Sequence, residues 1–163
     1  MQGKDNSYYL RRTFYKTWLR QGSIFLDYRN DTAFTNNDNY ILYGHNTKDG
    51  TMFYDLTKYK NYDFFKNNRY IYVNSLSQQF VYEVFSVFIT PSKDFYYLYK
   101  NFSNDKHFYD YIESVKDISI MFNEDISLMP SDRLLTLSTC TYERLGNYSL
   151  NRLVVLAKLV DVH

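Results

Sequence analysis

The chain has one cysteine, two prolines and five glycines among its 163 residues. A single cysteine cannot form an internal disulfide, so no disulfide framework holds the fold together. No stretch approaches the roughly 18–20 continuous apolar residues of a membrane-spanning helix. The polar residues 1–5 do not resemble a secretory signal peptide. The sequence therefore leaves two expectations open: a cytoplasmic protein, or an ectodomain whose membrane anchor has been removed.

An excess of charge of either sign is also missing. Nineteen basic and 18 acidic residues give a net charge of +1, which does not indicate a nucleic-acid-binding surface or a strongly anionic partner. The sequence contains no Gly-rich phosphate loop, no Cys or His pair at metal-ligand spacing and no serine nucleophile elbow. We therefore expect no nucleic-acid partner, no cofactor and no metal.

Aromatic residues are abundant, with 19 Tyr and 13 Phe. These residues favour strands, and the scarcity of Pro and Gly favours long, regular ones. The length indicates one domain over residues 1–163, large enough to bury about 70% of its unfolded surface. Strands are predicted over residues 23–28, 40–43, 69–73, 79–89, 133–139 and 153–162. Segment 79–89 is apolar on both faces, as in a central barrel strand.

Helical periodicity appears in several places. Residues 8–20 predict an amphipathic helix that Gly22 ends, and short helical patterns follow at 53–58 and 62–66. A longer helix is predicted over residues 105–118, with Asn104 or Asp105 as its cap. Its apolar face contains Phe108, Tyr111, Ile112 and Val115. This helix interrupts a 40-residue stretch between strands, and such long connections usually carry function.

The cysteine, Cys140, ends the strand-like run 135–140. It is either a small core residue or a nucleophile. His45 follows another apolar run, and Arg152 begins the last one. A thiolate is the reactive form of cysteine, an imidazole can stabilise it and protonate a leaving amine, and a guanidinium can hold an oxyanion. Because His45 and Cys140 are 95 residues apart, only the fold can bring them together.

Three other residues compete for these roles. Arg144 lies four positions after Cys140, but in a polar turn that also contains Gly146. His107 starts the helix predicted over residues 105–118, and His163 is the last residue of the chain. We therefore favour His45 and Arg152 as partners of Cys140.

These residues resemble the sortases, bacterial cysteine transpeptidases that attach surface proteins to the cell wall. The resemblance rests on Leu-Thr-Leu-Ser-Thr-Cys at residues 135–140, Tyr-Gly-His-Asn at 43–46 and Asn-Arg-Leu-Val-Val at 151–155. Residues 22–30 and 49–53 are similar to class B members. The resemblance implies a mostly β fold, a closed eight-stranded barrel with an N-terminal helix and a long helix inserted between strands 6 and 7.

The resemblance also implies a reaction. Cys140 would attack the threonine carbonyl of a C-terminal sorting motif, His45 would protonate the departing amine, and Arg152 would hold the oxyanion. A cell-wall peptide amine, or that of its lipid-linked precursor, would then resolve the thioacyl enzyme. The motif would be of the Asn-Pro-x-Thr-Asn or the Pro-x-Thr-Gly type. Substrate-binding positions implied by the match are Tyr43, Ser138, Thr141, Asn30, Phe34, Tyr97 and Leu98.

Class B members carry an N-terminal membrane anchor, which this chain lacks. The resemblance therefore implies a soluble ectodomain that works at the extracytoplasmic face of a Gram-positive plasma membrane. A pilin-polymerising sortase would bring an N-terminal lid, which the sequence does not show. Two alternatives remain: a non-catalytic extracellular β-barrel binding module with a buried Cys140, and a cysteine hydrolase of peptides, in which water replaces the amine.

Overall fold

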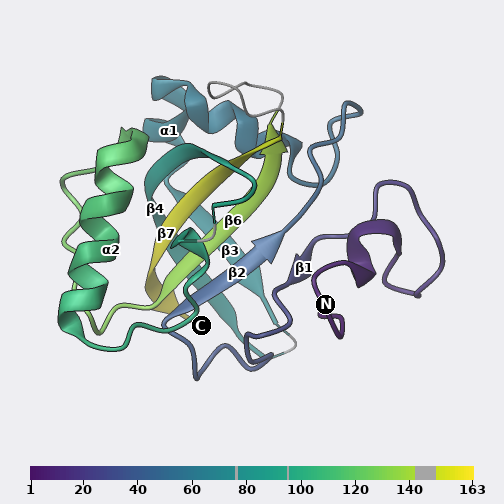
Figure 1. Ribbon diagram of the computed structural model, residues 1–163, viewed down its shortest axis with the longest axis horizontal. Helices are drawn as coiled ribbons and strands as arrows, with labels where there is room; N and C mark the ends of the chain where they lie inside the picture. Colours follow the sequence, from purple (N-terminus) through teal and green to yellow (C-terminus); the bar gives the residue numbers. More distant parts are fainter. Residues whose placement is uncertain (76, 95, 142–149) are drawn as a thin grey trace.

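The computed structural model describes residues 1–75, 77–94, 96–141 and 150–163, and within these ranges seven strands form one strongly curved sheet (Figure 1). The strands are β1 (Phe25–Leu26), β2 (Asn39–Tyr43), β3 (Tyr70–Asn74), β4 (Gln79–Pro91), β5 (Ser119–Phe122), β6 (Leu134–Thr141) and β7 (Asn151–Val162). Their order is β1-β2-β6-β7-β4-β3, and β5 also pairs with β4. Only the β2–β6 pairing among these is parallel.

The expected class, mostly β with a few helices, is confirmed. The described chain has seven strands where the resemblance implied eight, and no ladder in this part of the chain joins β3 back to β1. The hairpin of β3 and β4 is present as predicted, with Tyr70 opposite Glu83. The polar turn predicted around Gly146, with Arg144, lies outside the described residues.

Two apolar clusters cover the two faces of the sheet, which explains why β4 is apolar on both sides. One cluster contains Phe80, Tyr82 and Val84 of β4. The other contains Phe85 and Phe88 of the same strand. The register of β4 shifts against β7 between Val84 and Ser86. The prediction of a central, doubly buried strand over residues 79–89 is therefore confirmed.

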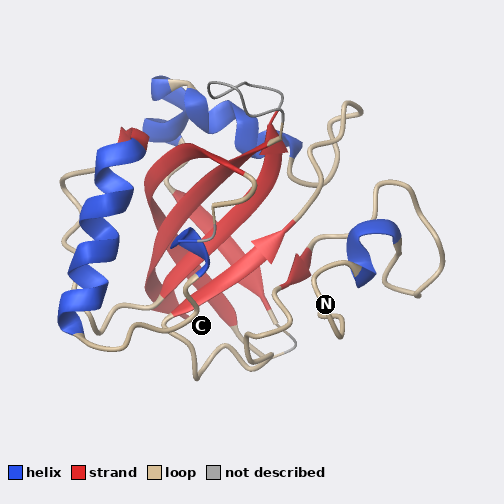
Figure 2. Cartoon of the chain, viewed as in Figure 1, coloured by secondary structure: helices blue, strands red, loops and turns tan. Residues whose placement is uncertain are grey.

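Helices lie around the sheet (Figure 2). The 3-10 helix η2 (Tyr54–Lys60) and α1 (Tyr62–Asn67) contribute to the first cluster, and η3 (Tyr96–Leu98) and α2 (Asp105–Ile118) contribute to the second. The predicted helix over residues 105–118 is confirmed, and its cap is Asn104, whose side-chain oxygen accepts the His107 N–H at 2.9 Å. This helix falls between β4 and β5 in the observed strand order. None of the described helices has the length and apolar character needed to span a membrane.

The prediction of a helix over residues 8–20 is wrong. Only η1 (Tyr8–Arg11) is helical, and the chain then turns back on itself through a bridge between Arg12 and Trp18. The apolar periodicity has no core to pack against, because Phe14 and Trp18 are 66% and 73% exposed. Tertiary contacts, rather than local periodicity, decide such marginal helices.

Candidate active site

The parallel pairing of β2 and β6 brings the segment after β2 beside the end of β6. Tyr43 lies opposite Ser138 in the register. Beyond the strand, the Gly44 N–H donates to the Ser138 carbonyl at 3.3 Å, and the Asn46 side-chain amide donates to the Cys140 carbonyl at 3.0 Å. His45, between these two contacts, therefore lies next to the Cys140 end of β6. The fold brings together residues that are 95 positions apart.

Cys140 and Arg152 are cross-strand neighbours on β6 and β7. Their Cα positions are paired in the antiparallel register, and Arg152 Nη1 donates to Cys140 Sγ at 2.8 Å. Both residues are half-buried, so the sulfur is neither a closed core atom nor fully solvated. A neighbouring cation favours the thiolate form of a cysteine in general. The arrangement supplies a cysteine and a permanent cation to the same point.

His45 is held by the N-terminal segment. Its Nε2 lies 2.8 Å from the Leu10 carbonyl oxygen, which can only accept, so this nitrogen carries the hydrogen. In the neutral ring, Nδ1 then keeps a free lone pair. Gly22 adopts φ +61°, and a Cβ there would come within 2.4 Å of the Leu10 oxygen. From the sequence, Gly22 is predicted only to end a helix. In the structure, its lack of a side chain lets the Leu10 carbonyl approach closely, and this carbonyl contacts His45.

A cavity of about 190 Å³ lies between these strand ends. His45 and Arg152 line it, together with four of the predicted substrate-binding residues, Tyr43, Ser138, Tyr97 and Leu98. The Ser138 hydroxyl is buried and has no hydrogen-bond partner among the described residues. Buried polar groups normally find a partner, so a lone hydroxyl in a cavity wall suits a ligand that supplies one.

An ion pair between the buried Asp27 and the exposed Arg29 supports one wall of this cavity. The Tyr43 hydroxyl donates to Asp27 at 2.9 Å, and Arg29 pairs with the same carboxylate at 2.8 Å. Burial opposes ionisation of Asp27, but hydrogen bonds from Arg29, Asn6 and Tyr43 outweigh it and lower its pKa. Burial and the negative charge of Asp27 raise the pKa of Tyr43, so this hydroxyl stays protonated at neutral pH.

The other predicted substrate-binding residues lie outside this cavity wall. Asn30 is buried, where its amide donates to the Asn39 carbonyl at 2.8 Å and its oxygen accepts the Ile41 N–H at 3.0 Å. Phe34 stacks on Tyr40 with ring centroids 4.4 Å apart. Thr141 is buried at the end of β6.

The competing residues are also placed. His107, on α2, packs against Tyr99, and the His163 ring lies 3.1 Å from the Asp161 carboxylate. Neither histidine lines the two cavities that contain His45 in their walls. Arg144 lies outside the described residues.

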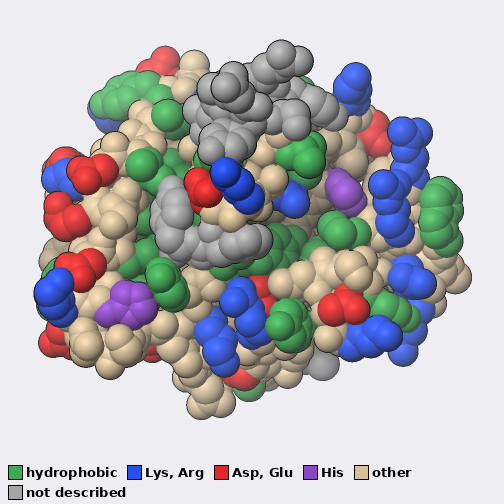
Figure 3. Space-filling model, viewed as in Figure 1, with side chains coloured by type: hydrophobic (Ala, Val, Ile, Leu, Met, Phe, Trp, Pro, Cys, Tyr) green, Lys and Arg blue, Asp and Glu red, His purple; other side chains and the backbone are tan. Residues whose placement is uncertain are grey.

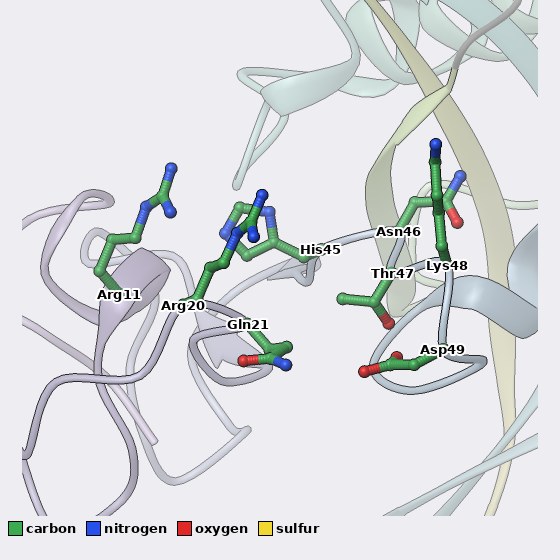
Figure 4. A pocket seen from close by; sticks show the side chains of 8 residues that line it. All are labelled: Arg11, Arg20, Gln21, His45, Asn46, Thr47, Lys48 and Asp49. Atoms are coloured by element: carbon green, nitrogen blue, oxygen red, sulfur yellow. The ribbon is translucent and has the colours of Figure 1, made fainter.

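A second cavity, of about 500 Å³, also contains His45 in its wall (Figure 4). Arg11 and Arg20 contribute to this wall, and no sequence pattern singles out either residue. The two arginines come close to His45 only because the fold places residues 8–22 beside it.

Comparison with known proteins identifies relatives along nearly the whole chain. The Sortase domain family model matches residues 6–160. The chain is 41% identical over 161 residues to sortase B of Listeria monocytogenes, covering 98% of this chain and 63% of that protein. It is 36% identical over 162 residues to sortase B of Staphylococcus aureus, covering 99% and 64%. The chain thus spans less than two thirds of the length of these curated relatives.

Similarity extends to the three-dimensional structure. The solved Staphylococcus aureus sortase B–substrate complex matches with a TM-score of 0.87 at 35% identity, over 99% of this chain and 72% of that one.

Proposed function

Because this chain belongs to the sortase family, with sortase B proteins as its relatives, we propose that it is a class B cysteine transpeptidase. The observation that carries the proposal is the 2.8 Å contact between Arg152 Nη1 and Cys140 Sγ, beside His45 and the 190 Å³ cavity. A buried structural cysteine would need no cation on its sulfur, and Arg152, which supplies this cation, also lines the cavity. This argument favours an enzyme over a binding module.

The first half of the reaction transfers an acyl group to sulfur. The Cys140 thiolate attacks the threonine carbonyl of the sorting motif, and a C–S bond forms. Arg152 donates to the oxygen that gains negative charge, which stabilises the tetrahedral intermediate. The C–N bond to the next residue breaks, and the departing nitrogen takes a proton from His45. The products are a thioacyl enzyme, a neutral His45 and a free peptide amine.

The second half returns the enzyme to its starting state. A cell-wall peptide amine, or the amine of the lipid-linked precursor, attacks the thioester carbonyl. The C–S bond breaks, a new amide bond forms, and the amine's surplus proton passes to His45. Cys140 leaves as the thiolate, so charge and protons balance over the cycle. If water replaces the amine, the same steps give hydrolysis.

We place the peptide in the cavity lined by Tyr43, Ser138, Tyr97 and Leu98. Asn30, Phe34 and Thr141 stay proposed contacts for other parts of the motif or the chain that follows it. The substrates proposed are secreted surface proteins with an Asn-Pro-x-Thr-Asn or Pro-x-Thr-Gly motif. The proposed location is the extracytoplasmic face of a Gram-positive plasma membrane, with residues 1–163 as the catalytic domain.

A panel of quenched peptides carrying the two motif types tests this function. Each peptide is incubated with and without an amine acceptor, and products are identified by mass spectrometry. We expect cleavage after threonine and an acceptor-linked product, both lost in Cys140→Ala and strongly reduced in His45→Ala. His107→Ala is the matched control, because that histidine lines neither cavity beside His45, and it should retain full activity.

The alternatives give different results in this experiment. Cleavage without acceptor-linked product would identify a hydrolase. No cleavage of any peptide, with a Cys140 that resists alkylation, would support the binding module.

A further inference from the structure

The second cavity beside His45 has a positively charged wall. Arg11, Arg20 and Lys48 line it, against a single carboxylate, Asp49 (Figure 4). This balance differs from that of the whole chain, whose net charge is only +1. Lys and Arg side chains also gather on the same side of the molecule as the N-terminal segment (Figure 3). Positive charge is therefore concentrated near the histidine.

The backbone holds the two arginines next to each other. Arg11 ends η1, and its carbonyl accepts the Leu19 N–H at 2.9 Å, directly before Arg20. Figure 4 shows both guanidinium groups on the His45 side of the cavity. Two like charges held together in this way favour an anion between them.

Neither guanidinium has a hydrogen bond or an ion pair within the described ranges of the chain. The single carboxylate in the wall is already engaged, because Asp49 accepts the Thr51 N–H at 3.1 Å and the Thr51 hydroxyl at 2.7 Å. These hydrogen bonds, with one from Thr47, lower the pKa of Asp49 to about 2. Among the described residues Asp49 pairs with neither Arg11 nor Arg20, because its carboxylate is turned to its own loop, so the two guanidinium groups are available for an external anion.

His45 lines both cavities, so it stands between the proposed peptide site and the arginines. Proceeding from the transpeptidase function proposed above, we propose that the cavity of Arg11 and Arg20 binds the acceptor, and that this acceptor is an amine that also carries an anionic group. The anionic group is a carboxylate or a phosphate. The amine then reaches the thioester on Cys140 from the His45 side.

Two physical effects support this class of acceptor. Guanidinium groups match the geometry of carboxylate and phosphate oxygens, with two parallel hydrogen bonds each. A positive environment also disfavours the ammonium form of an amine, and only the neutral amine is a nucleophile. The anionic group therefore provides binding, while the arginines and His45 keep the nitrogen reactive.

Acceptors that differ by one charge test the proposal. Triglycine and triglycinamide have the same amine, but only triglycine carries a carboxylate. We expect Arg11→Gln/Arg20→Gln to raise the acceptor KM for triglycine about tenfold and that for triglycinamide by less than twofold. The matched control is Lys16→Gln/Lys66→Gln, which removes the same charge from exposed positions outside the cavity and should leave both KM values unchanged. Equal effects of the arginine variant on the two acceptors, or none, would overturn the proposal.

A binding measurement separates this proposal from the function on which it rests. In Cys140→Ala, which cannot react, the His45 ring resonances are followed by NMR during titration with triglycine, triglycinamide or inorganic phosphate. We expect triglycine to shift them and triglycinamide to do so much more weakly. Competition by phosphate at lower concentration than triglycine would identify a phosphate-bearing acceptor. Unshifted resonances with both anions would overturn the anion site even if peptide cleavage succeeds.

Discussion

Replacing Ser138 by alanine should make the protein more stable and less active. The Ser138 hydroxyl is buried in the cavity wall without a partner among the described residues. A buried hydroxyl that loses its hydrogen bonds costs about 1–3 kcal/mol on protein-derived scales. Removing only the oxygen leaves a very small void, so we expect the free energy of unfolding to rise by about 1 kcal/mol, or about 2–4 °C in Tm for a chain of this size.

The activity of the same variant should fall, because the substrate loses its partner. One neutral hydrogen bond contributes about 0.5–1.5 kcal/mol, so kcat/KM for peptide cleavage should decrease roughly two- to thirteenfold. Urea unfolding measures the stability and quenched-peptide cleavage measures the activity.

Thr139→Val is the matched control. The adjacent Thr139 hydroxyl is also buried, but it donates to the Gly44 carbonyl at 2.8 Å. This variant should lose about 1 kcal/mol of stability, opposite in sign to Ser138→Ala. A destabilised Ser138→Ala protein, or one with unchanged kcat/KM, would refute the assignment of this hydroxyl to the substrate.

Three further perturbations follow from the contacts around the cavity. Arg152→Lys should lower kcat about 10²–10³-fold, because an ammonium lacks the paired N–H donors with which a guanidinium can bind the Cys140 sulfur and the oxyanion together. A kcat that is unchanged in steady-state assays would argue against oxyanion binding by Arg152. Gly22→Ala should lower kcat and destabilise the fold by about 1–3 kcal/mol, since the added Cβ would displace the Leu10 carbonyl that contacts His45. NMR resonances of the His45 ring report this displacement. Unchanged resonances together with an unchanged kcat would contradict the prediction. Asp27→Asn should cost about 1–2 kcal/mol at neutral pH. Because the pKa of Asp27 is lowered in the folded protein, its ionised carboxylate adds stability above about pH 4, and this stability is lost as the pH falls through the folded pKa. Urea unfolding of the wild-type and Asp27→Asn proteins should therefore give free energies of unfolding that converge in acid. A difference in free energy that does not change with pH would exclude the ionised carboxylate as the cause.

Regular elements with a strong pattern were predictable from the sequence. The α2 helix has an apolar face and an Asn104 cap, both local features, and its predicted bounds match. The β4 strand was recognisable because it is apolar on both faces. The N-terminal helix failed for the opposite reason: residues 12–20 have the periodicity of a helix, but no apolar surface covers Phe14 or Trp18. Periodicity predicts structure only where a core receives the apolar face.

The proximity of Cys140 and Arg152 could be predicted from the sequence, but the contacts that hold the proposed site could not. Cys140 and Arg152 could be paired by their positions at strand ends, and the register places them opposite each other. The contact between His45 and the Leu10 carbonyl could not be foreseen, because a backbone carbonyl leaves no mark in the sequence. The cavity of Arg11 and Arg20 depends on the same backbone arrangement, so local sequence contains no signal for it either.

The position of β2 at the margin of the sheet has a consequence for how activity is lost. His45 follows β2, which is joined to the rest of the sheet through five residue pairs with β6, whereas β4 and β7 pair from Phe80–Val162 to Pro91–Asn151. Native proteins open locally where few contacts hold an element, at lower free energy than global unfolding. Mild denaturant should therefore displace the segment that follows β2, with His45, before the ladder between β4 and β7 opens. We expect the proposed transpeptidase activity to disappear at lower denaturant concentration than the circular dichroism signal of the sheet.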